Sequence, residues 1–370
     1  MRRGIRFRAY PNKQQKILID KTFGCCRLVY NKGIEMRETA FNNGEKCNYV
    51  KTTKMIPELK KSEEYSYLKE VDNTAMIQSL RDLDVAYDRY FKKIGDKPKF
   101  KTKHNLHQRY RTVMNCNNIR IEGNHIRLPK INYLKIKQSR EVGVIKNVTV
   151  EKTPSGKYFV IINEEFTPKK YRKRKTKVGI DVGIKNFLTD SNGNIVENPK
   201  YYEKYEKKIV REQKRLNKKE KGSKNREKQR IRLAKAHEKI YNSRKDFLHK
   251  LSSSYIRDNQ TICVEDLRIK GMLKNSRLAK HINSVSWGKF FEMLEYKAEW
   301  YGRELIKIPT FFPSSQTCSA CGYKNPDVKN LSVRKWTCPK CNTHHDRDHN
   351  ASLNILAKGL NCTAGHTGTV

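Results

Sequence analysis

The sequence of 370 residues has no long hydrophobic run. No window approaches the roughly 20 continuous apolar residues that a membrane-spanning helix needs. The first residues, MRRGIRFRAY, also lack the apolar core of a signal peptide. These absences exclude a membrane-spanning protein and favour one that stays in the cytosol. Attachment to a membrane surface through basic charge is left open as an alternative.

Two further features are missing. There is no P-loop and no glycine-rich dinucleotide fingerprint, so the sequence gives no sign of a nucleotide-binding enzyme of those classes. The 10 cysteines do not form the evenly distributed framework of a small disulfide-rich domain. A reducing compartment is therefore expected, in which cysteines are available as metal ligands.

Acidic residues are scarce relative to basic ones. Lysine and arginine number 80 against 38 acidic residues, which gives a formal net charge of +42. This excess is spread along the chain instead of being confined to one tail. It predicts a polyanionic partner, held in an extended channel along a nucleic-acid backbone, with binding that weakens steeply as salt rises.

Four cysteines form the most specific motif. Cys318 and Cys321 make one Cys-x-x-Cys pair, Cys338 and Cys341 make a second, and 16 residues separate the pairs. This is the spacing of a four-thiolate zinc ribbon, in which two tight turns meet around one tetrahedral ion. The segment 314–345 is therefore predicted to be a zinc ribbon, and its four thiolates, which close the coordination sphere, favour a structural ion.

The first half of the chain predicts a small β-barrel interrupted by helices. Residues 3–10 alternate basic and apolar side chains, as a strand does, and helical spacing follows, including segments 55–68 and 73–94 with Asn73 as the cap. From 99 to 166 short alternating runs return. Exposed aromatic and basic residues there could bind nucleic acid or could be ordinary strand residues; they are Phe100, Lys101, Tyr110 and Arg111.

The second half of the chain predicts an α/β domain, after a basic segment over 169–177 that is either a linker or a clamp on nucleic acid. Segment 178–196 is expected to form two strands, the second starting after Asn192-Gly193. Residues 201–250 carry 19 basic and 7 acidic residues and predict a helical hairpin that contacts nucleic acid. A strand over 261–267, an aromatic-rich core helix over 285–300 and a further strand over 304–308 follow.

Three carboxylates lie at the ends of predicted elements. Asp181 stands in an apolar run, where it either has a structural hydrogen-bond partner or binds a cation. Glu265 and Asp266 end a strand, and only one of them can face a given site. Asp348 begins a helix, where it is either a metal ligand or only the N-cap. If Asp181, Glu265 and Asp348 converge, they predict a site for two Mg²⁺ or Mn²⁺ ions that cleaves phosphodiesters.

The segments that carry these residues resemble a known family. GIDVGIKNFLT, VEDLRIKGM, SSQTCSACG with TCPKC, and DRDHNASLNIL are similar to the TnpB (OrfB) proteins of bacterial insertion sequences, which are related to the type V CRISPR effectors. The opening YPNKQQKILIDKTFGCCRLVYN, KPKFKTK, and NSVSWGKFFEMLEYKAEWYG resemble the same family. The resemblance therefore covers nearly the whole chain in order.

This resemblance implies an α/β fold with a RuvC-like, RNase H-type nuclease domain into which the zinc ribbon is inserted, preceded by a wedge-type β-barrel that carries a helical recognition lobe. The implied ranges are 1–10 and 96–172 for the barrel, 11–95 for the lobe, 173–313 and 346–360 for the nuclease, 314–345 for the ribbon and 361–370 for a tail. It further implies a guide RNA from the protein's own element as partner, and cleavage of double-stranded DNA beside a short adjacent motif in the bacterial cytosol.

Carried over onto this sequence, the catalytic and magnesium-binding residues are Asp181, Glu265 and Asp348, and the zinc ligands are the four ribbon cysteines. Asp266 and Asp346 are neighbouring carboxylates that could be mistaken for catalytic ones. Two rival functions are a transposase that joins DNA strands, for which no His-x-His motif with a separate tyrosine is present, and a non-cleaving RNA-guided regulator. The sequence leaves the oligomeric state undetermined.

Overall fold

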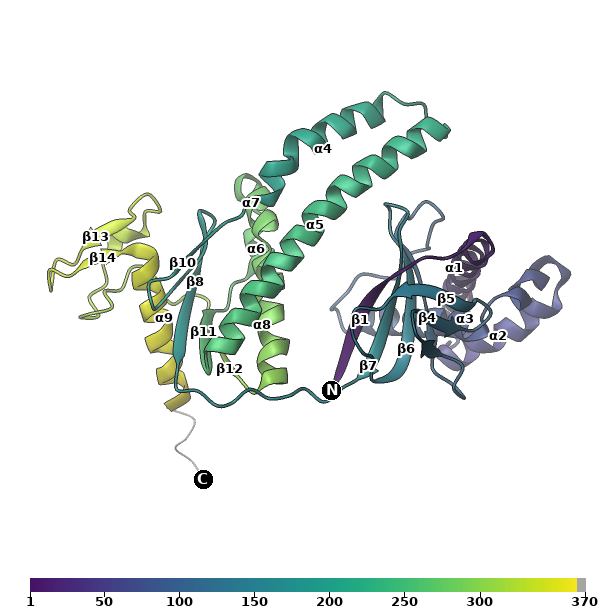
Figure 1. Cartoon of the computed structure of the whole chain (residues 1–370), viewed down its shortest axis with the longest axis horizontal. Coiled ribbons are helices and arrows are strands. Elements are labelled where there is room, and N and C mark those ends of the chain that lie inside the picture. Colours follow the sequence, from purple (N-terminus) through teal and green to yellow (C-terminus); the bar gives the residue numbers. More distant parts are fainter. Residues whose placement is uncertain (365–370) are drawn as a thin grey trace. The chain divides into compact units, whose positions relative to one another are not determined.

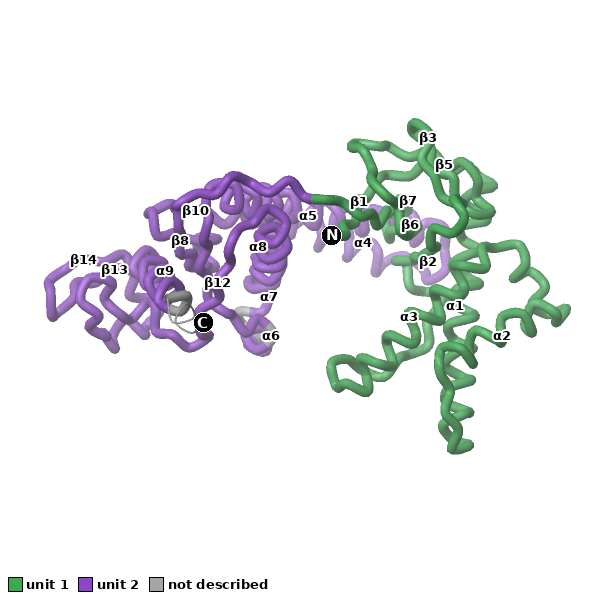
Figure 2. Tube along the Cα trace, turned by 90° about the horizontal axis from the view of Figure 1, so that it is seen from below, with its two compact units in different colours: residues 1–167 green, residues 168–370 purple. Residues whose placement is uncertain are grey.

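The computed structural model describes residues 1–364, without the side chains of 270, 276–278 and 362–364. The predicted tail lies outside the described residues from 365 onward. The chain forms two compact units, Met1–Thr167 and a second that begins at Pro168 (Figures 1 and 2). Among the residues described, no helix combines the length and the apolarity needed to cross a membrane.

Unit one holds a seven-stranded antiparallel sheet and a group of helices between its first two strands. Its elements are β1 (Arg2–Ala9), α1 (Lys13–Asn42), α2 (Tyr49–Lys61), the 3-10 segment η1 (Glu63–Glu70), α3 (Asn73–Phe91), β2 (Gln108–Val113), β3 (Arg120–Glu122), β4 (His125–Leu128), β5 (Asn132–Lys137), β6 (Val144–Lys152) and β7 (Tyr158–Glu165). The strand order is β2-β6-β7-β1-β5-β4-β3. Along the chain, the helices α1, α2 and α3 thus lie between β1 and β2.

Strand β1 shows how its sequence fixes its register. Ile5 and Phe7 are buried, whereas Arg6 between them and Arg8 after them lie on the other face. Arg6 donates to the Glu151 carboxylate at 2.9 and 2.7 Å and stacks over the Phe159 ring at 3.4 Å. A shift of one residue would bury these cations without partners, so the alternating pattern specifies one pairing.

The helix ends differ in detail from the prediction. Asn12 and Gln15 form a reciprocal capping box at the start of α1. The cap of α3 is Asp72, whose carboxylate accepts from the Thr74 backbone N–H, so the prediction of Asn73 as the cap is wrong by one residue. The predicted helix over 55–68 is two elements, since the chain is extended at Ser62 between α2 and η1.

Hydrogen bonding leaves the sheet of unit one with two edges. β2 and β3 stand at opposite ends of the strand order, and no ladder between described strands joins them. The observed structure is therefore an antiparallel sheet whose core is shared with α1 and α3, through residues such as Phe23, Leu80 and Tyr110. This joint core explains how the helices and strands of unit one form one body.

Unit two contains a five-stranded sheet, long helices and a small two-stranded ribbon. Its elements are β8 (Lys177–Val182), β9 (Asn186–Asp190), β10 (Ile195–Glu197), α4 (Tyr201–Asn217), α5 (Lys224–Asp258), β11 (Thr261–Glu265), α6 (Ile269–Met272), α7 (Ser276–Val285), α8 (Trp287–Tyr301), β12 (Glu304–Ile308), η2 (Pro326–Lys329), β13 (Lys335–Thr337), β14 (His344–Asp346) and α9 (Arg347–Ala364). The order is β10-β9-β8-β11-β12, with β8, β11 and β12 parallel.

Segment 177–197 forms three strands, so the prediction of two strands is wrong. The missed strand is β9, which pairs antiparallel with β8 and ends at Asp190. The Asp190 carboxylate is buried and accepts from the backbone N–H groups of Asn192 and Asn194 and from the Tyr255 hydroxyl. It thereby fixes a tight turn, in which Gly193 adopts a φ of 84°.

The predicted helical hairpin is confirmed as α4 and α5, with a break at Gly222 between them (Figure 1). The two helices share a small apolar seam, and Gln229 donates to the Glu212 carboxylate at 2.7 Å inside it. The second half of α5 turns from this seam to the main core, where it packs against α8. Of the aromatic residues predicted to lie in the core from α8, Trp287, Phe290 and Phe291 are buried, whereas Tyr296 and Trp300 are only half-buried.

The sheet of unit two is covered on both faces. Val178, Ile180, Ile262 and Val264 face α5 and α8, whereas the residues between them face α9. α9 approaches the sheet closely at two glycines: a Cβ on Gly179 would lie 2.2 Å from the Ser352 carbonyl oxygen, and one on Gly359 would lie 2.4 Å from Cys263 Sγ. Because both positions lack a side chain, the helix backbone lies directly on β8 and β11.

We predict that Gly179→Ala destabilises unit two, because the added methyl group displaces α9 from β8. Overpacking of this kind costs about 1–3 kcal/mol, which lowers the melting temperature by several degrees. Gly271→Ala is the matched control, since a Cβ there meets nothing within 4 Å. Differential scanning calorimetry measures both, and equal melting of Gly179→Ala and the wild type would contradict the close-packing argument.

Candidate active site and cysteine cluster

Two of the predicted carboxylates end neighbouring parallel strands. Ile180 of β8 pairs with Val264 of β11, so Asp181 and Glu265 occupy adjacent positions at the carboxyl ends of the two strands. Side chains alternate along a strand, and Gly179 and Cys263 both face α9. Asp181 and Glu265 therefore share that face of the sheet.

The third carboxylate reaches the same face from α9. Asp348 lies in the first turn of this helix, which packs over β8 and β11. The charges of Glu265 and Asp348 both act on Asp181, so the three carboxylates lie within one electrostatic site. They are more widely spaced than the ligands of a single ion, because within residues 1–364 only the four ribbon cysteines place all their ligand atoms within 4.8 Å of one another.

Burial and mutual repulsion disfavour the charged carboxylates. Asp181 keeps some exposed surface, but protein surrounds its carboxyl group, and this burial raises its pKa well above the usual range. The charges of Glu265 and Asp348 raise it further, while Arg347 opposes them. Burial also raises the pKa of Glu265, although a hydrogen bond from Ser314 opposes this rise. Excess negative charge of this kind favours a bound cation.

The capping function left open for Asp348 belongs to Asp346. Asp346 Oδ1 accepts from the backbone N–H groups of Asp348 and His349, both at 3.1 Å. The Asp348 carboxylate is not needed for the cap, and its Oδ1 lies 3.5 Å from Arg334 Nη1. Asp266 is exposed. Because successive side chains of a strand point to opposite faces, Asp266 faces away from the site that Glu265 faces.

Ser314 is a site residue that the sequence did not reveal. Its hydroxyl donates to Glu265 Oε1 at 2.5 Å and is buried. The hydrogen bond fixes the direction of the Glu265 side chain. One signal was present in the sequence, namely the position of Ser314 at the start of the predicted ribbon, but its contact with Glu265 depends on the path of the chain between β12 and Cys318.

The four predicted ribbon cysteines form one cluster. Their sulfur atoms lie within 4.8 Å of one another, with 3.6 Å between the Sγ atoms of Cys318 and Cys341 and 3.6 Å between those of Cys321 and Cys338. A tetrahedron with metal–sulfur bonds of about 2.3 Å has edges of about 3.8 Å. The thiols therefore fit one tetrahedral ion. Of the cysteine side chains described, none forms a disulfide.

The cluster is joined to the carboxylate site through α9. Asn350 is buried, accepts from the Ser319 backbone N–H at 2.9 Å and donates to the Thr317 carbonyl at 2.7 Å. Asn354 donates to the carbonyls of Ser314 and Thr317 at 2.8 and 2.6 Å. The first cysteine turn, the Ser314 segment and the start of α9 are thus one hydrogen-bonded unit.

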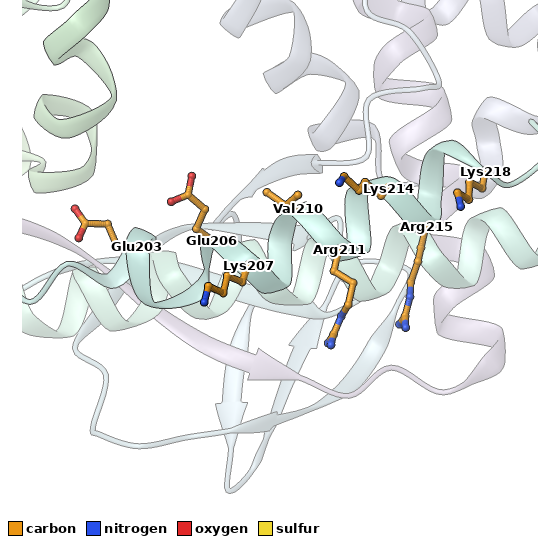
Figure 3. Close-up of a pocket in the computed structure, with 8 residues that line it drawn as sticks. All are labelled: Glu203, Glu206, Lys207, Val210, Arg211, Lys214, Arg215 and Lys218. Atoms are coloured by element: carbon orange, nitrogen blue, oxygen red, sulfur yellow. The ribbon is translucent and has the colours of Figure 1, made fainter.

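The outer face of α4 is strongly basic. A hollow of about 690 Å³ lies on this face. Figure 3 shows Glu203 and Glu206 at one end of it and cations along the rest. Arg211 and Arg215 share the carboxylate of Glu212. The other three cations of this face are exposed, and they form no ion pair with any residue that the structure describes: Lys207, Lys214 and Lys218.

Comparison with known proteins identifies the family. A 368-residue match with a Streptomyces pristinaespiralis protein named "Putative RNA-guided DNA endonuclease" is 37% identical and covers 98% of this chain and 91% of the relative. This chain belongs to the TnpB family. The Escherichia coli K12 family member named "Putative RNA-guided DNA endonuclease InsQ" is 30% identical over 376 residues, which are 96% of this chain and 92% of that protein. A mimivirus member named "TnpB-like protein L770" is 25% identical, over 96% of this chain and 73% of its own length.

Family models match three parts of this TnpB-family chain. Residues 148–276 match the OrfB family of IS605, described as "Probable transposase", and 287–355 match a "Cas12f1-like, TNB domain". Residues 1–46 match a "Helix-turn-helix domain", although here they form β1 and the single long helix α1. A solved "Cas12f1-sgRNA-target DNA complex" aligns over 96% of this chain and 99% of its own chain, at 17% identity and a TM-score of 0.37.

We predict that Mn²⁺ raises the melting temperature of the protein and that Asp181→Asn removes most of this shift. An ion that binds only the folded state stabilises that state, and the stabilisation grows with the logarithm of the ion concentration. In EDTA, Asp181→Asn melts above the wild type, because it removes one charge from a crowded site. Asp266→Asn is the control and retains the Mn²⁺ shift. Equal Mn²⁺ shifts in all three proteins would show that these carboxylates hold no ion.

We also predict that replacing Lys207, Lys214 and Lys218 with alanine weakens nucleic-acid binding and flattens its salt dependence. Loss of three phosphate contacts reduces the slope of log K against log salt by about 2 to 3. The helix persists, because alanine is the strongest helix former. Fluorescence anisotropy with labelled RNA and DNA at several salt concentrations measures the slope.

The control for this experiment removes the same charge elsewhere. Lys21, Lys32 and Lys51 are each already paired with a glutamate. Their triple alanine variant should keep the wild-type slope within about 0.5, since paired lysines contact no phosphate. If the slope of log K against log salt falls by the same amount in both triple variants, net charge alone drives binding and α4 is not a specific binding surface.

Proposed function

We propose that this protein is an RNA-guided, metal-dependent DNA endonuclease encoded by a transposable element. The observation that carries this proposal is the placement of Asp181 and Glu265 on adjacent parallel strands, with Asp348 above them on α9. Membership of the TnpB family over nearly the whole chain supports it, because relatives of similar length are named as RNA-guided DNA endonucleases. The proposed substrate is double-stranded DNA beside a short adjacent motif.

Asp181, Glu265 and Asp348 would hold the catalytic cations, and their crowded negative charge fits this role. When bound, paired Mg²⁺ or Mn²⁺ ions activate a water molecule and stabilise the leaving oxygen. Ser314 orients Glu265, while Arg347 supplies positive charge near Asp181. Arg334 lies close enough to Asp348 to restrain its carboxylate. These residues would thus position the carboxylates that hold the ions. Because the activated water is the nucleophile, cleavage needs no nucleophilic side chain.

The cysteine cluster would hold one structural Zn²⁺ ion. Four thiolates close the coordination sphere and leave no position for a substrate. Through Asn350 and Asn354, the ion would stabilise the segments that carry Ser314 and Asp348. Thiolate ligands need a reduced environment, so we assign the protein to the cytosol.

We further propose that unit two is a RuvC-like, RNase H-type domain with the ribbon inserted at 314–345. Unit one would correspond to the wedge-type β domain, with the helical lobe between β1 and β2 as its insertion. The basic face of α4 would contact the sugar–phosphate backbone of guide RNA or target DNA, since its free cations suit phosphate groups. Base pairing with the guide would supply sequence specificity.

A transposase that joins DNA strands is the second candidate, because the description "Probable transposase" accompanies the model that matches 148–276. Such an enzyme would yield joined DNA products. A guided nuclease yields breaks, and a guided regulator yields neither. The three functions therefore differ in their products.

We predict guided, Mg²⁺-dependent breaks in a plasmid library with randomised flanking sequence, made by protein co-expressed with RNA from its own locus. Asp181→Ala, Glu265→Ala and Asp348→Ala should each abolish cleavage while binding to guide and target persists. Asp266→Ala is the control and should cleave normally. Joined products would favour the transposase, whereas binding of the wild type without breaks in Mg²⁺ or Mn²⁺ would overturn the nuclease in favour of a regulator.

A further inference from the structure

An exposed aromatic ring stands beside the candidate active site. The side chain of Phe311 is 82% exposed, although its neighbour Phe312 packs into the apolar cluster around Cys263. The Arg268 guanidinium lies over the Phe311 ring, 5.4 Å from its centroid. Arg268 is itself exposed, and the part of the chain that the structure describes offers it no ion pair. The pair thus presents a free ring face and a free cation.

Both residues are attached to the strand ends that carry the site. Arg268 follows Glu265 in the segment after β11, and Phe311 precedes Ser314 in the segment after β12. Glu265 is in register with Ile308, and the Asp266 N–H donates to the Ile308 carbonyl at 3.1 Å. The two segments therefore leave the sheet together, on the edge where Ser314 contacts Glu265.

The Phe311 segment is held firmly from behind. The half-buried Phe312 ring and the Asn354 hydrogen bond to the Ser314 carbonyl fix the backbone on either side of the turn. An exposed ring on such a support can bind a flat partner at little cost in conformational entropy. Single exposed hydrophobic residues are common on proteins, but a free guanidinium stacked on one beside a carboxylate site adds a second, phosphate-binding group.

We infer that Phe311 and Arg268 form a binding site for one nucleotide of a single strand, next to the carboxylates. The Phe311 ring stacks on an unpaired base, and the Arg268 guanidinium pairs with the adjoining phosphate. Stacking does not depend on which base is present, so the site would position any strand for cleavage. This inference rests on the proposed nuclease function, because it places the nucleotide beside the bond to be cleaved.

The test uses the full-length protein and a short oligothymidine that carries one 2-aminopurine, in Ca²⁺ to prevent cleavage. Stacking on Phe311 should quench the 2-aminopurine fluorescence. Phe311→Ala should abolish most of the quenching and weaken binding about 10-fold, whereas Phe311→Trp should restore both. Phe41→Ala is the matched control, since Phe41 is also 82% exposed and lies in unit one.

The salt dependence separates the two residues. Arg268→Ala should reduce the slope of log K against log salt by about 0.7, the value for one phosphate of a single strand. Phe311→Ala should leave this slope unchanged, because stacking releases no counterion. Equal quenching by Phe311→Ala and the wild type would overturn the stacking site, and an unchanged slope in Arg268→Ala would overturn the phosphate contact.

Asp181→Asn distinguishes this inference from the proposed function. If the chain is a nuclease, this variant loses guided cleavage but quenches 2-aminopurine as the wild type does. Retained cleavage by Asp181→Asn would refute the proposed catalytic site. The stacking site would still be decided by the quenching of Phe311→Ala compared with the wild type. Loss of quenching in Phe311→Ala together with a higher KM and an unchanged kcat for cleavage would support strand positioning by this ring.

Discussion

The close contact between α9 and the sheet of unit two is the constraint on which the site depends. The helix backbone lies directly on β8 and β11 because Gly179 and Gly359 have no side chains at the points of contact. This contact sets the height of the first turn of α9 above the strand ends. It therefore determines how near Asp348 comes to Asp181 and Glu265.

The cysteine cluster also supports the contact between α9 and the sheet of unit two. Asn350 and Asn354 join α9 to the first cysteine turn, and Ser314 extends this unit to Glu265. A metal ion bound by the thiolates would stabilise the fold of the ribbon and, through these hydrogen bonds, the geometry of the carboxylates. The acidic site lies in a chain with a net charge of +42, so a nucleic-acid strand is attracted by the surroundings while cations are attracted by the carboxylates.

The sequence was sufficient for the residue types and for most elements, because they depend on local patterns. The cysteine spacing predicted the cluster, and side-chain alternation showed that only one of Glu265 and Asp266 could face a site. The register of β8 on β11 and the approach of α9 depend on contacts between distant segments, which no local pattern encodes. The same limit explains why Ser314 was missed and why the cap of α9, at Asp346, could not be told from Asp348. Strand β9 was missed because the turn residues Asn192-Gly193 give a clearer signal in the sequence than the five residues of the strand itself.

Asp181, Glu265 and Asp348 are proposed to hold the catalytic cations together, as a site for two ions. Anomalous diffraction from crystals of the protein grown in Mn²⁺, with data at the manganese and zinc edges, tests this proposal most directly. We expect manganese between these three carboxylates and zinc among the four cysteines. Manganese elsewhere, or an ordered site in which the carboxylates bind no ion, would contradict this proposal.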